Sequence, residues 1–202
     1  VDQKIRKQPI DLVICKNCEL VQLGHNFDLK YLYGPDYGYR TGINNTMLDH
    51  VQSVVKNLSK KTKLKKKDHV LDIASNDGSL LNFYNKNIIT FGIDPILDKY
   101  ITKYKNINHK ISSFFSAKLI KTKTKKKFKI ITALSVFYDA INPNKFIKDA
   151  KSLLRDDGIF LLEFADLASI IENKMFDTIC HEHLEYYSSK VIIDLCCKNN
   201  LR

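Results

Sequence analysis

The chain has 202 residues, of which 44% are hydrophobic and 27% are charged. This composition supplies a packed core, which excludes wholesale disorder, and no run approaches the roughly 20 apolar residues of a membrane span. The 33 Lys and Arg residues outnumber the 22 Asp and Glu residues, and the resulting net charge of +11 first suggests nucleic acid or an anionic surface as a partner.

Both ends of the sequence resemble cuts through a longer chain. Val1 opens a polar stretch, and no long apolar region of the kind found in signal peptides follows it. The five cysteines are an odd number, which favours free thiols in a reducing compartment. We therefore expect a fragment of a longer, cytoplasmic protein.

The first predicted elements are two short strands within residues 10–23, joined by a turn that contains Cys15 and Cys18. Zinc needs four ligands, usually from two such CxxC pairs, so these thiols favour half of a zinc ribbon. A redox CxxC and two ordinary cysteines are the alternatives. Redox motifs of this kind follow a strand and open a helix, whereas apolar residues flank this pair on both sides.

Residues 24–42 are rich in Gly and Tyr and predict a loop. Five Phe and Tyr side chains are unusual in a solvated linker, so we expect the loop to pack on the protein. Asn44 or Asn45 then caps a predicted helix that runs to about Lys60. Its apolar residues recur near a period of 3.6: Met47, Leu48, Val51, Val54, Val55 and Leu58.

The remainder of the chain alternates strands with helices. Helical stretches lie between the strands, one of them through Tyr100 and Tyr104, and Asn142-Pro143 opens another. Asp157-Gly158 predicts a turn before the last strand. Alternation of this kind predicts parallel pairing in a doubly wound α/β sheet with both faces covered. The predicted strands are 69–74, 89–94, 107–112, 128–134 and 158–164.

The turn after the first of these strands, residues 72–78, is built from acidic and small residues. The dinucleotide fingerprint GxGxxG is absent, so a pyrophosphate cradle is not expected. Asp94-Pro95 ends the second strand, and an acid at this position can accept both hydroxyls of a ribose. The pattern is typical of S-adenosylmethionine binding, with an ordinary α/β turn as the alternative.

A His-Glu-His run, His181, Glu182 and His183, follows the last strand and precedes two tyrosines. Histidine is the side chain most easily poised for proton transfer near neutral pH, and an adjacent carboxylate can fix its tautomer. The zinc-protease motif HExxH is excluded, because Glu185 stands where its second histidine would be. Ordinary hydrogen-bonded loop histidines are the alternative.

Four stretches together resemble the sugar-nucleotide C-methyltransferases of deoxysugar pathways. They are YGPDYGYRTGINNTMLDH (33–50), VLDIASNDGSLL (70–81), SVFYDAINPNKF (135–146) and FDTICHEHLEYYS (176–188). The resemblance implies a Rossmann-like class I S-adenosylmethionine-dependent methyltransferase sheet, preceded by the remnant of a zinc-ribbon module. It also implies a C-terminal domain that the chain lacks. The implied boundaries are 1–42 for the partial zinc module and aromatic loop, 43–189 for the methyltransferase domain and 190–202 for the start of a connector.

The resemblance also assigns roles by position. Two positions depart from the family pattern: Cys180, where some members have tyrosine, and Asp139, where relatives have histidine. The implied catalytic residues are His183, Glu182, His181, Tyr37 and Tyr39; the cofactor residues are Asp72, Ala74, Asn76, Asp77, Gly78, Asp94, Pro95 and Ser135; and the structural zinc ligands are Cys15 and Cys18.

The expected reaction is S-adenosylmethionine-dependent C-methylation of a 4-keto-6-deoxy sugar attached to a nucleotide. His183 is the expected base, Glu182 orients it, and Tyr37, Tyr39 or His181 stabilises the enolate oxygen. Rival hypotheses are an inactive fold that only binds the cofactor, and a methyltransferase for another small molecule or RNA. The lysines concentrate at 60–67 and 118–129 without interleaved aromatic residues, so we expect no nucleic-acid or membrane partner.

Overall fold

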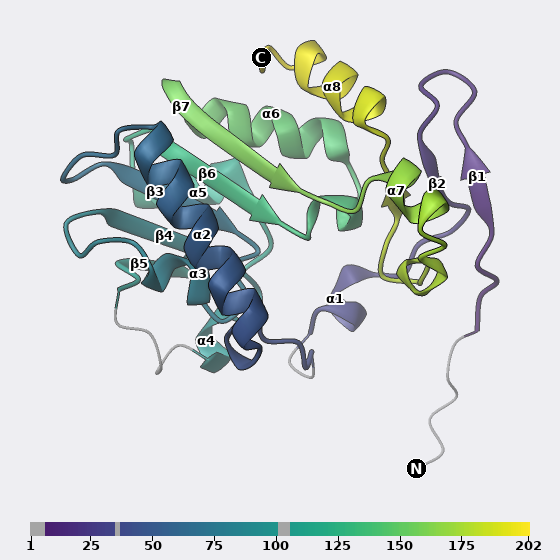
Figure 1. Ribbon diagram of the computed structural model, residues 1–202, viewed down its shortest axis with the longest axis horizontal. Coiled ribbons are helices and arrows are strands. Elements are labelled where there is room, and N and C mark those ends of the chain that lie inside the picture. The colour runs from purple at the N-terminus through teal and green to yellow at the C-terminus, as the bar shows by residue number, and fades with distance from the viewer. Residues whose placement is uncertain (1–6, 35–36, 101–105) are drawn as a thin grey trace.

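The computed structural model describes residues 7–34, 37–100 and 106–202. Its centre is a five-stranded sheet in the order β5-β4-β3-β6-β7 (Figure 1). Every neighbouring pair is parallel, which confirms the predicted α/β class and places a topological switch between β3 and β6. The strands are β3 (His69–Ile73), β4 (Ile89–Ile93), β5 (His109–Ile111), β6 (Phe128–Leu134) and β7 (Leu154–Glu163).

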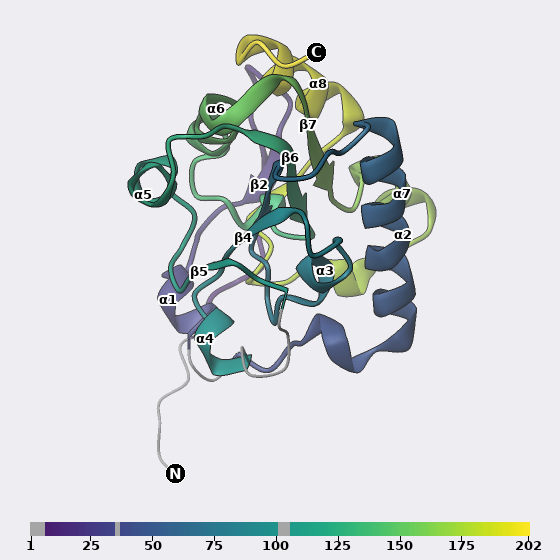
Figure 2. The same cartoon turned by 90° about the vertical axis from the view of Figure 1, so that its left-hand side faces the viewer.

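Helices cover both faces of this sheet, with α2 and α3 on one face and α5 and α6 on the other (Figure 2). Successive residues of a strand point to opposite faces, so Ile130 packs in the cluster of Val51 and Val55, while Ile131 packs with Ile120 and Ala150. Both clusters are buried, as the near-continuous apolar strands predict. The helices are α2 (Asn45–Lys61), α3 (Ser79–Asn82), α4 (Leu97–Tyr100), α5 (Ala117–Lys123) and α6 (Pro143–Leu153).

Two predicted boundaries are wrong. Strand β7 begins at Leu154, so Asp157 and Gly158 lie within the strand rather than in a turn before it. The pairing shifts there, from Phe128 opposite Leu154 to Ile130 opposite Ile159, and this irregularity accommodates the extra residues. The helical stretch expected between the first two strands is limited to the four residues of α3. The predicted helical stretch after β4 begins as α4, but its continuation through Tyr104 lies outside the described residues.

A second, three-stranded antiparallel sheet joins the two ends of the chain. The predicted N-terminal hairpin is present, and its second strand pairs with a strand from the block that follows the His-Glu-His run. Gln22 lies opposite Glu185, and the Leu23 N–H donates to the Leu184 carbonyl at 2.8 Å. The strands are β1 (Leu12–Ile14), β2 (Val21–Leu23) and β8 (Glu185–Tyr186).

The remaining short elements surround the junction of the two sheets. Helix α8 lies beside α6, and its Val191 and Leu195 pack with Phe137 and Ile147 (Figure 1). Among the described residues, none of the helices combines the length and the apolar character that a bilayer span requires. The elements are α1 (Leu29–Leu32), α7 (Leu167–Glu172), α8 (Ser189–Lys198) and the 3₁₀ turns η1 (Thr41–Ile43), η3 (Phe137–Asp139) and η4 (Phe176–Thr178).

Helix α2 carries the clearest local start and stop signals in the chain. The Asn44 side chain accepts hydrogen bonds from the backbone N–H groups of Thr46 and Met47, as the sequence predicts for an N-cap. Lys60 and Lys61 lie in the last turn, where positive charge is favourable. The tyrosine-rich residues 27–34 and 37–42 are called the aromatic segment. The Asn44 cap fixes the point at which helix α2 begins after this segment.

We predict that Asn44→Ala lowers the free energy of unfolding by about 1 kcal/mol, because the first turn of α2 loses its side-chain acceptor. The matched control is Asn45→Ala, since Asn45 is exposed and its side chain makes no hydrogen bond with the described residues. Urea denaturation of both variants measures the difference. Equal destabilisation by the two changes would contradict the capping role.

Candidate active site

A cavity of about 760 Å³ opens at the carboxyl ends of β3, β4 and β6. This volume is within the usual range of about 300–1,000 Å³ for small-molecule sites, and its position beside the topological switch is where open α/β sheets bind ligands. The aromatic segment, the start of α6 and the His-Glu-His block complete its walls. Of the predicted site residues, it brings together Tyr37, Tyr39, Asp72, Ala74, Asn76, Asp94, Pro95, Ser135, Glu182 and His183.

The turn after β3 is tight and carries left-handed backbone conformations. Ala74 has φ 56° and Asn76 has φ 50°, which turn the chain sharply beneath the cavity. Gly78 has φ +82°, and an added Cβ there would stand 2.3 Å from the Ile107 side chain. Only glycine fits at this position without strain, and the small residues of the predicted motif therefore have a steric reason.

Asp94, at the end of β4, is held in place by the neighbouring turn. Its Oδ2 accepts from the Asn76 N–H at 2.9 Å, and its Oδ1 accepts from the Ile96 N–H at 2.8 Å. Burial raises the pKa of this carboxyl, and the two backbone donors oppose that shift. Each oxygen retains a second lone pair that can accept from a ligand hydroxyl in the cavity.

Asp72 lies deeper, at the end of β3, and accepts from the Thr132 hydroxyl at 2.5 Å. Its side chain is buried, and burial raises its pKa to about 7, while the Thr132 hydroxyl acts in the opposite direction. Asp72 and Asp94 come from adjacent parallel strands, so the sheet register itself brings the two acids to one edge.

Asp77 and Gly78 do not line the cavity, although the sequence assigns both to the cofactor. Asp77 is fully buried, and its Oδ2 accepts from the Gly42 N–H at 2.9 Å. Its Oδ1 accepts from the backbone N–H and the hydroxyl of Ser79. Asp77 therefore ties the aromatic segment to the β3 turn. Asn76 strengthens this tie, because its side chain bonds to the Tyr39 carbonyl and the Thr41 N–H.

The aromatic segment packs over the cavity, as its composition suggests. The rings of Tyr33 and Tyr37 meet edge to face with centroids 5.0 Å apart, and both line the cavity. Burial raises the pKa of Tyr37 to about 12, and the negative charge of Glu182 adds to the shift. The Arg40 guanidinium lies 4.4 Å from the centre of the Tyr100 ring, which is within cation–π distance.

His183 has the geometry of a general base. Its Nδ1 lies 2.7 Å from the Thr178 carbonyl oxygen, which can only accept, so Nδ1 carries the hydrogen. In the neutral ring this leaves a lone pair on Nε2. The ring packs on Tyr138 with centroids 4.3 Å apart, and the Leu184 N–H donates to the Tyr138 carbonyl at 2.9 Å.

His181 lies outside the cavity, in contrast to the predicted catalytic role. Its Nδ1 lies 3.2 Å from Nε2 of His25, and its ring packs 5.1 Å from the ring of Phe27. These partners belong to the segment that follows β2. His181 therefore packs against His25 and Phe27, whereas His183 lines the cavity.

The cavity wall also contains polar residues to which the sequence analysis gives no role, among them Tyr33, Tyr138 and Asp139. Asp139 lies in η3 and is only 6% exposed. Burial raises its pKa to about 8, and the negative charge of Glu182 adds to the shift. The sequence could have pointed to Asp139, because relatives have histidine at this position. The only sequence signal for Tyr33 is that its segment is rich in aromatic residues.

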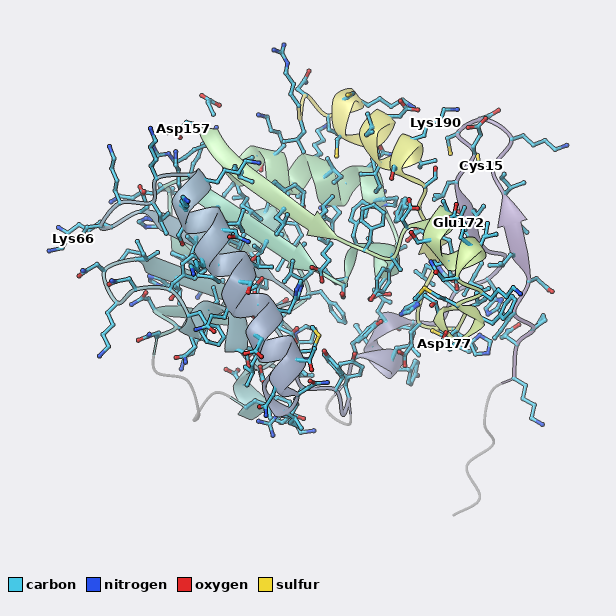
Figure 3. The ribbon with its side chains drawn as sticks, in the orientation of Figure 1. Cys15, Lys66, Asp157, Glu172, Asp177 and Lys190 are labelled. Atoms are coloured by element: carbon cyan, nitrogen blue, oxygen red, sulfur yellow. The ribbon has the colours of Figure 1, made fainter. Side chains whose placement is uncertain are left out.

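The Cys15 and Cys18 thiols lie in the turn between β1 and β2, far from Lys66 at the other end of the molecule (Figure 3). Backbone N–H groups of Asn17 and Cys18 lower the pKa of Cys15. No helix follows the pair, which argues against the redox alternative. Within the described ranges, no group of three or more His, Cys, Asp or Glu residues could hold a metal ion. Two thiols alone do not fit the four-ligand requirement of zinc.

Comparison with known protein families identifies most of the chain as a methyltransferase domain. Residues 39–202 match the family model described as "Methyltransferase domain". The C-methyltransferase NovU of Streptomyces niveus is 24% identical over 197 residues, which cover 96% of this chain and 47% of NovU. The chain therefore spans about half the length of this curated relative.

Solved methyltransferase structures share the fold. The plantazolicin methyltransferase BamL, in complex with SAH, superposes with a TM-score of 0.62 at 21% identity, covering 80% of this chain and 65% of BamL. The N-methyltransferase NodS of Bradyrhizobium japonicum, in complex with S-adenosyl-L-homocysteine, has a TM-score of 0.56 at 13% identity, covering 84% and 83%. The CurJ carbon methyltransferase has a TM-score of 0.56 at 10% identity, and the match covers 79% of this chain and 50% of CurJ.

The buried Glu185 beside this site makes the stability depend on pH. Its Oε2 has no hydrogen-bond partner among the described residues, and burial, followed by the charge of Asp139, raises its pKa to about 9. The folded state then binds the proton more tightly than the unfolded state. This contribution to stability is complete below the ordinary pKa near 4.5 and is lost as the pH rises towards 9.

We predict that Glu185→Gln, which is neutral at every pH, flattens this slope and raises the free energy of unfolding at pH 8 by about 1–4 kcal/mol. Denaturant titrations between pH 5 and pH 9 measure the effect relative to the wild type. The exposed Glu172→Gln is the control and is expected to leave the slope unchanged. A slope that Glu185→Gln does not alter would refute the prediction.

Proposed function

Because the chain belongs to the methyltransferase domain family, we propose that the protein is an S-adenosylmethionine-dependent methyltransferase that methylates a carbon next to a ketone. We propose as its substrate a 4-keto deoxysugar linked to a nucleotide. The observation that carries the proposal is that Asp94 and His183 line the same cavity, while the bond from Nδ1 of His183 to the Thr178 carbonyl leaves Nε2 to accept a proton. Asp94 can accept hydrogen bonds from a ribose, and His183 can accept a proton from a carbon atom.

The cofactor half of the cavity fits S-adenosylmethionine by its donor and acceptor pattern. This cofactor supplies its methyl group from a positively charged sulfonium. Asp94 would accept from the ribose hydroxyls, and Asp72 offers a buried carboxyl close by. The turn at Ala74 and Asn76 brings backbone close to the ligand without the glycine cradle that a pyrophosphate requires.

The chemistry of the other half follows from His183. A proton on carbon beside a ketone is acidic enough to remove when a base stands near it and a donor meets the ketone oxygen. Nε2 of His183 takes this proton, and the Thr178 carbonyl stabilises the Nδ1–H of the resulting imidazolium. Glu182 lines the same cavity, and its proposed role is to orient His183.

The nucleotide-sugar substrate rests on two kinds of support. The resemblance of the His-Glu-His block is to sugar-nucleotide C-methyltransferases, and the relative NovU is named a C-methyltransferase. The cavity wall also carries two lysines, Lys30 and Lys145, which can pair with phosphate oxygens. Lys145 already pairs with Asp149 within α6, whereas Lys30 forms no ion pair with the described residues and is available to a phosphate.

The position of the other lysines favours a small molecule over RNA. The lysine-rich stretch 60–67 directly precedes β3, and 118–129 runs through α5 to the start of β6. Both therefore lie towards the amino ends of the parallel strands, while the cavity opens at the carboxyl ends. A nucleic-acid substrate would need its phosphate contacts beside the cavity.

We predict that Asp94→Asn weakens binding of S-adenosylhomocysteine by about 10- to 100-fold, because the amide no longer offers two acceptors with negative charge to the ribose. Isothermal titration calorimetry measures the dissociation constant. The control is Asp98→Asn, an exposed acid of the adjacent helix α4. Unchanged affinity in Asp94→Asn would remove the carboxylate from the cofactor site.

We predict that His183→Ala lowers kcat for methylation by about 10²–10⁴-fold and leaves the affinity for S-adenosylhomocysteine unchanged, because the base is lost and the cofactor turn is untouched. The assay follows methyl transfer to a nucleotide-linked 4-keto-6-deoxy sugar by mass spectrometry, in the full-length protein. The control is His109→Ala, on β5 outside the cavity.

A second readout separates proton removal from methyl transfer. In deuterium oxide without the methyl donor, the wild type should exchange the hydrogen on the carbon beside the ketone, and His183→Ala should not. Methylation of oxygen or nitrogen in place of carbon would contradict the proposed reaction. Full exchange in His183→Ala would contradict only the choice of base.

A further inference from the structure

The ring of Tyr138 lies against the imidazole of His183, and the proposed reaction leaves this contact without a role. The ring centroids are 4.3 Å apart, and the two planes are inclined at 56°. Both residues line the cavity, although they are distant in the sequence. At this separation the rings are in direct contact, so the position of one ring limits the positions that are open to the other.

Tyr138 belongs to a turn that the hydrophobic core holds in place. It is the middle residue of η3, and the residue before it, Phe137, is fully buried. The Phe137 ring stacks on Tyr187 with centroids 4.9 Å apart and meets Phe146 edge to face at 5.3 Å. Because close packing fixes η3, it also fixes the backbone that carries the Tyr138 ring.

The backbone and the ring of Tyr138 act on the same short segment. The Leu184 N–H donates to the Tyr138 carbonyl at 2.9 Å, which holds the backbone directly after His183. The imidazole itself is held at Nδ1, which donates to the Thr178 carbonyl at 2.7 Å. One hydrogen bond leaves the imidazole free to tilt about that bond, because carbonyl oxygens accept over a broad range of directions. The Tyr138 ring blocks this tilt on one side of the imidazole.

We propose that Tyr138 is a positioning residue for the proposed base, and that its aromatic ring keeps Nε2 of His183 directed at the substrate carbon. This inference rests on the proposed function, because it concerns the residue that takes the proton. It gives a role to a cavity residue to which the sequence assigns none. The contact is made by the ring, so a phenyl group at position 138 preserves it.

The orientation of the imidazole matters for one step of the reaction. Nε2 takes the proton from the carbon beside the ketone, and the electron pair of that bond moves onto the ketone oxygen. The pair then returns through carbon to the new carbon–carbon bond, the ketone re-forms, and the pair of the broken carbon–sulfur bond stays on sulfur. A base displaced by about 1 Å can cost about 10²-fold in rate. Loss of the Tyr138 ring therefore slows proton removal and leaves cofactor binding unchanged.

The first test compares Tyr138→Leu, which removes the aromatic ring, with Tyr138→Phe, which keeps it. Tyr138→Leu should lower kcat by about 10- to 100-fold per molecule that binds S-adenosylhomocysteine, with unchanged KM and unchanged cofactor affinity. Exchange of the hydrogen beside the ketone in deuterium oxide should fall by the same factor. Tyr138→Phe should restore the wild-type values. The control is Tyr31→Leu, at an exposed tyrosine of α1 that does not line the cavity.

Three kinetic outcomes overturn the proposal. The first is an equal loss in Tyr138→Phe and Tyr138→Leu, since the hydroxyl would then be the active part. The second is wild-type hydrogen exchange in Tyr138→Leu. The third is a change in KM or in the number of S-adenosylhomocysteine sites while the molecules that still bind exchange hydrogen at the wild-type rate, which is the result of a merely structural role.

A second measurement needs no substrate and does not require Tyr138→Leu to fold. In the full chain with isotope-labelled histidine, nuclear Overhauser effects should connect the imidazole protons of His183 with the ring protons of Tyr138. The ¹³C relaxation of His183 should report a rigid imidazole in the wild type and in Tyr138→Phe. A mobile imidazole in the wild type, or absence of the Overhauser effects, overturns the inference. A rigid imidazole in contact with Tyr138, in a protein that methylates no ketone, supports the positioning contact and refutes the proposed function instead.

Discussion

The buried carboxylate of Asp77 is the interaction on which the arrangement of the site depends. It accepts from three donors on two residues: the Gly42 N–H, the Ser79 N–H and the Ser79 hydroxyl. The Arg40 Nε lies 3.8 Å away and supplies the nearest positive charge. Breaking such a network leaves a charge buried without partners, which costs several kcal/mol. The aromatic segment, the β3 turn and helix α3 therefore behave as one unit, and the tyrosines are held over the cavity.

A second constraint positions the His-Glu-His block from the opposite side. Pairing of β2 with β8 joins the N-terminal hairpin to the segment directly after His183. The Leu184 N–H donates to the Tyr138 carbonyl, so the same segment is also attached to η3, the turn that follows β6. His183, the proposed base, therefore lies in a short segment that is held on one side by the small sheet and on the other by η3. This rigidity is what a proton transfer over hydrogen-bond distance needs.

Acids with raised pKa values gather on one side of the molecule. Asp72, Asp139 and Glu185 are all buried, and desolvation is the largest cause of the raised pKa in each. Each costs stability as the pH rises, and the protein tolerates this cost near the cavity rather than elsewhere. The lysines that dominate the net charge precede the strands instead. The two lysine-rich stretches therefore contribute their positive charge at the amino ends of the strands, away from the cavity.

The sequence by itself determined the parts of this protein that depend on local chemistry. Apolar runs predicted the five strands, Asn44 predicted the start of α2, and the acid at position 94 marked the end of β4, because each signal acts within a few residues. The extended start of β7 escaped prediction, since Asp157-Gly158 is a turn signal that the pairing with β6 overrides. Only the tertiary structure decided that Asp77 joins the aromatic segment to the β3 turn, that His181 packs on His25, and that Tyr33 and Asp139 line one cavity. These roles depend on partners far away in the chain, and no local pattern encodes which buried polar groups will meet.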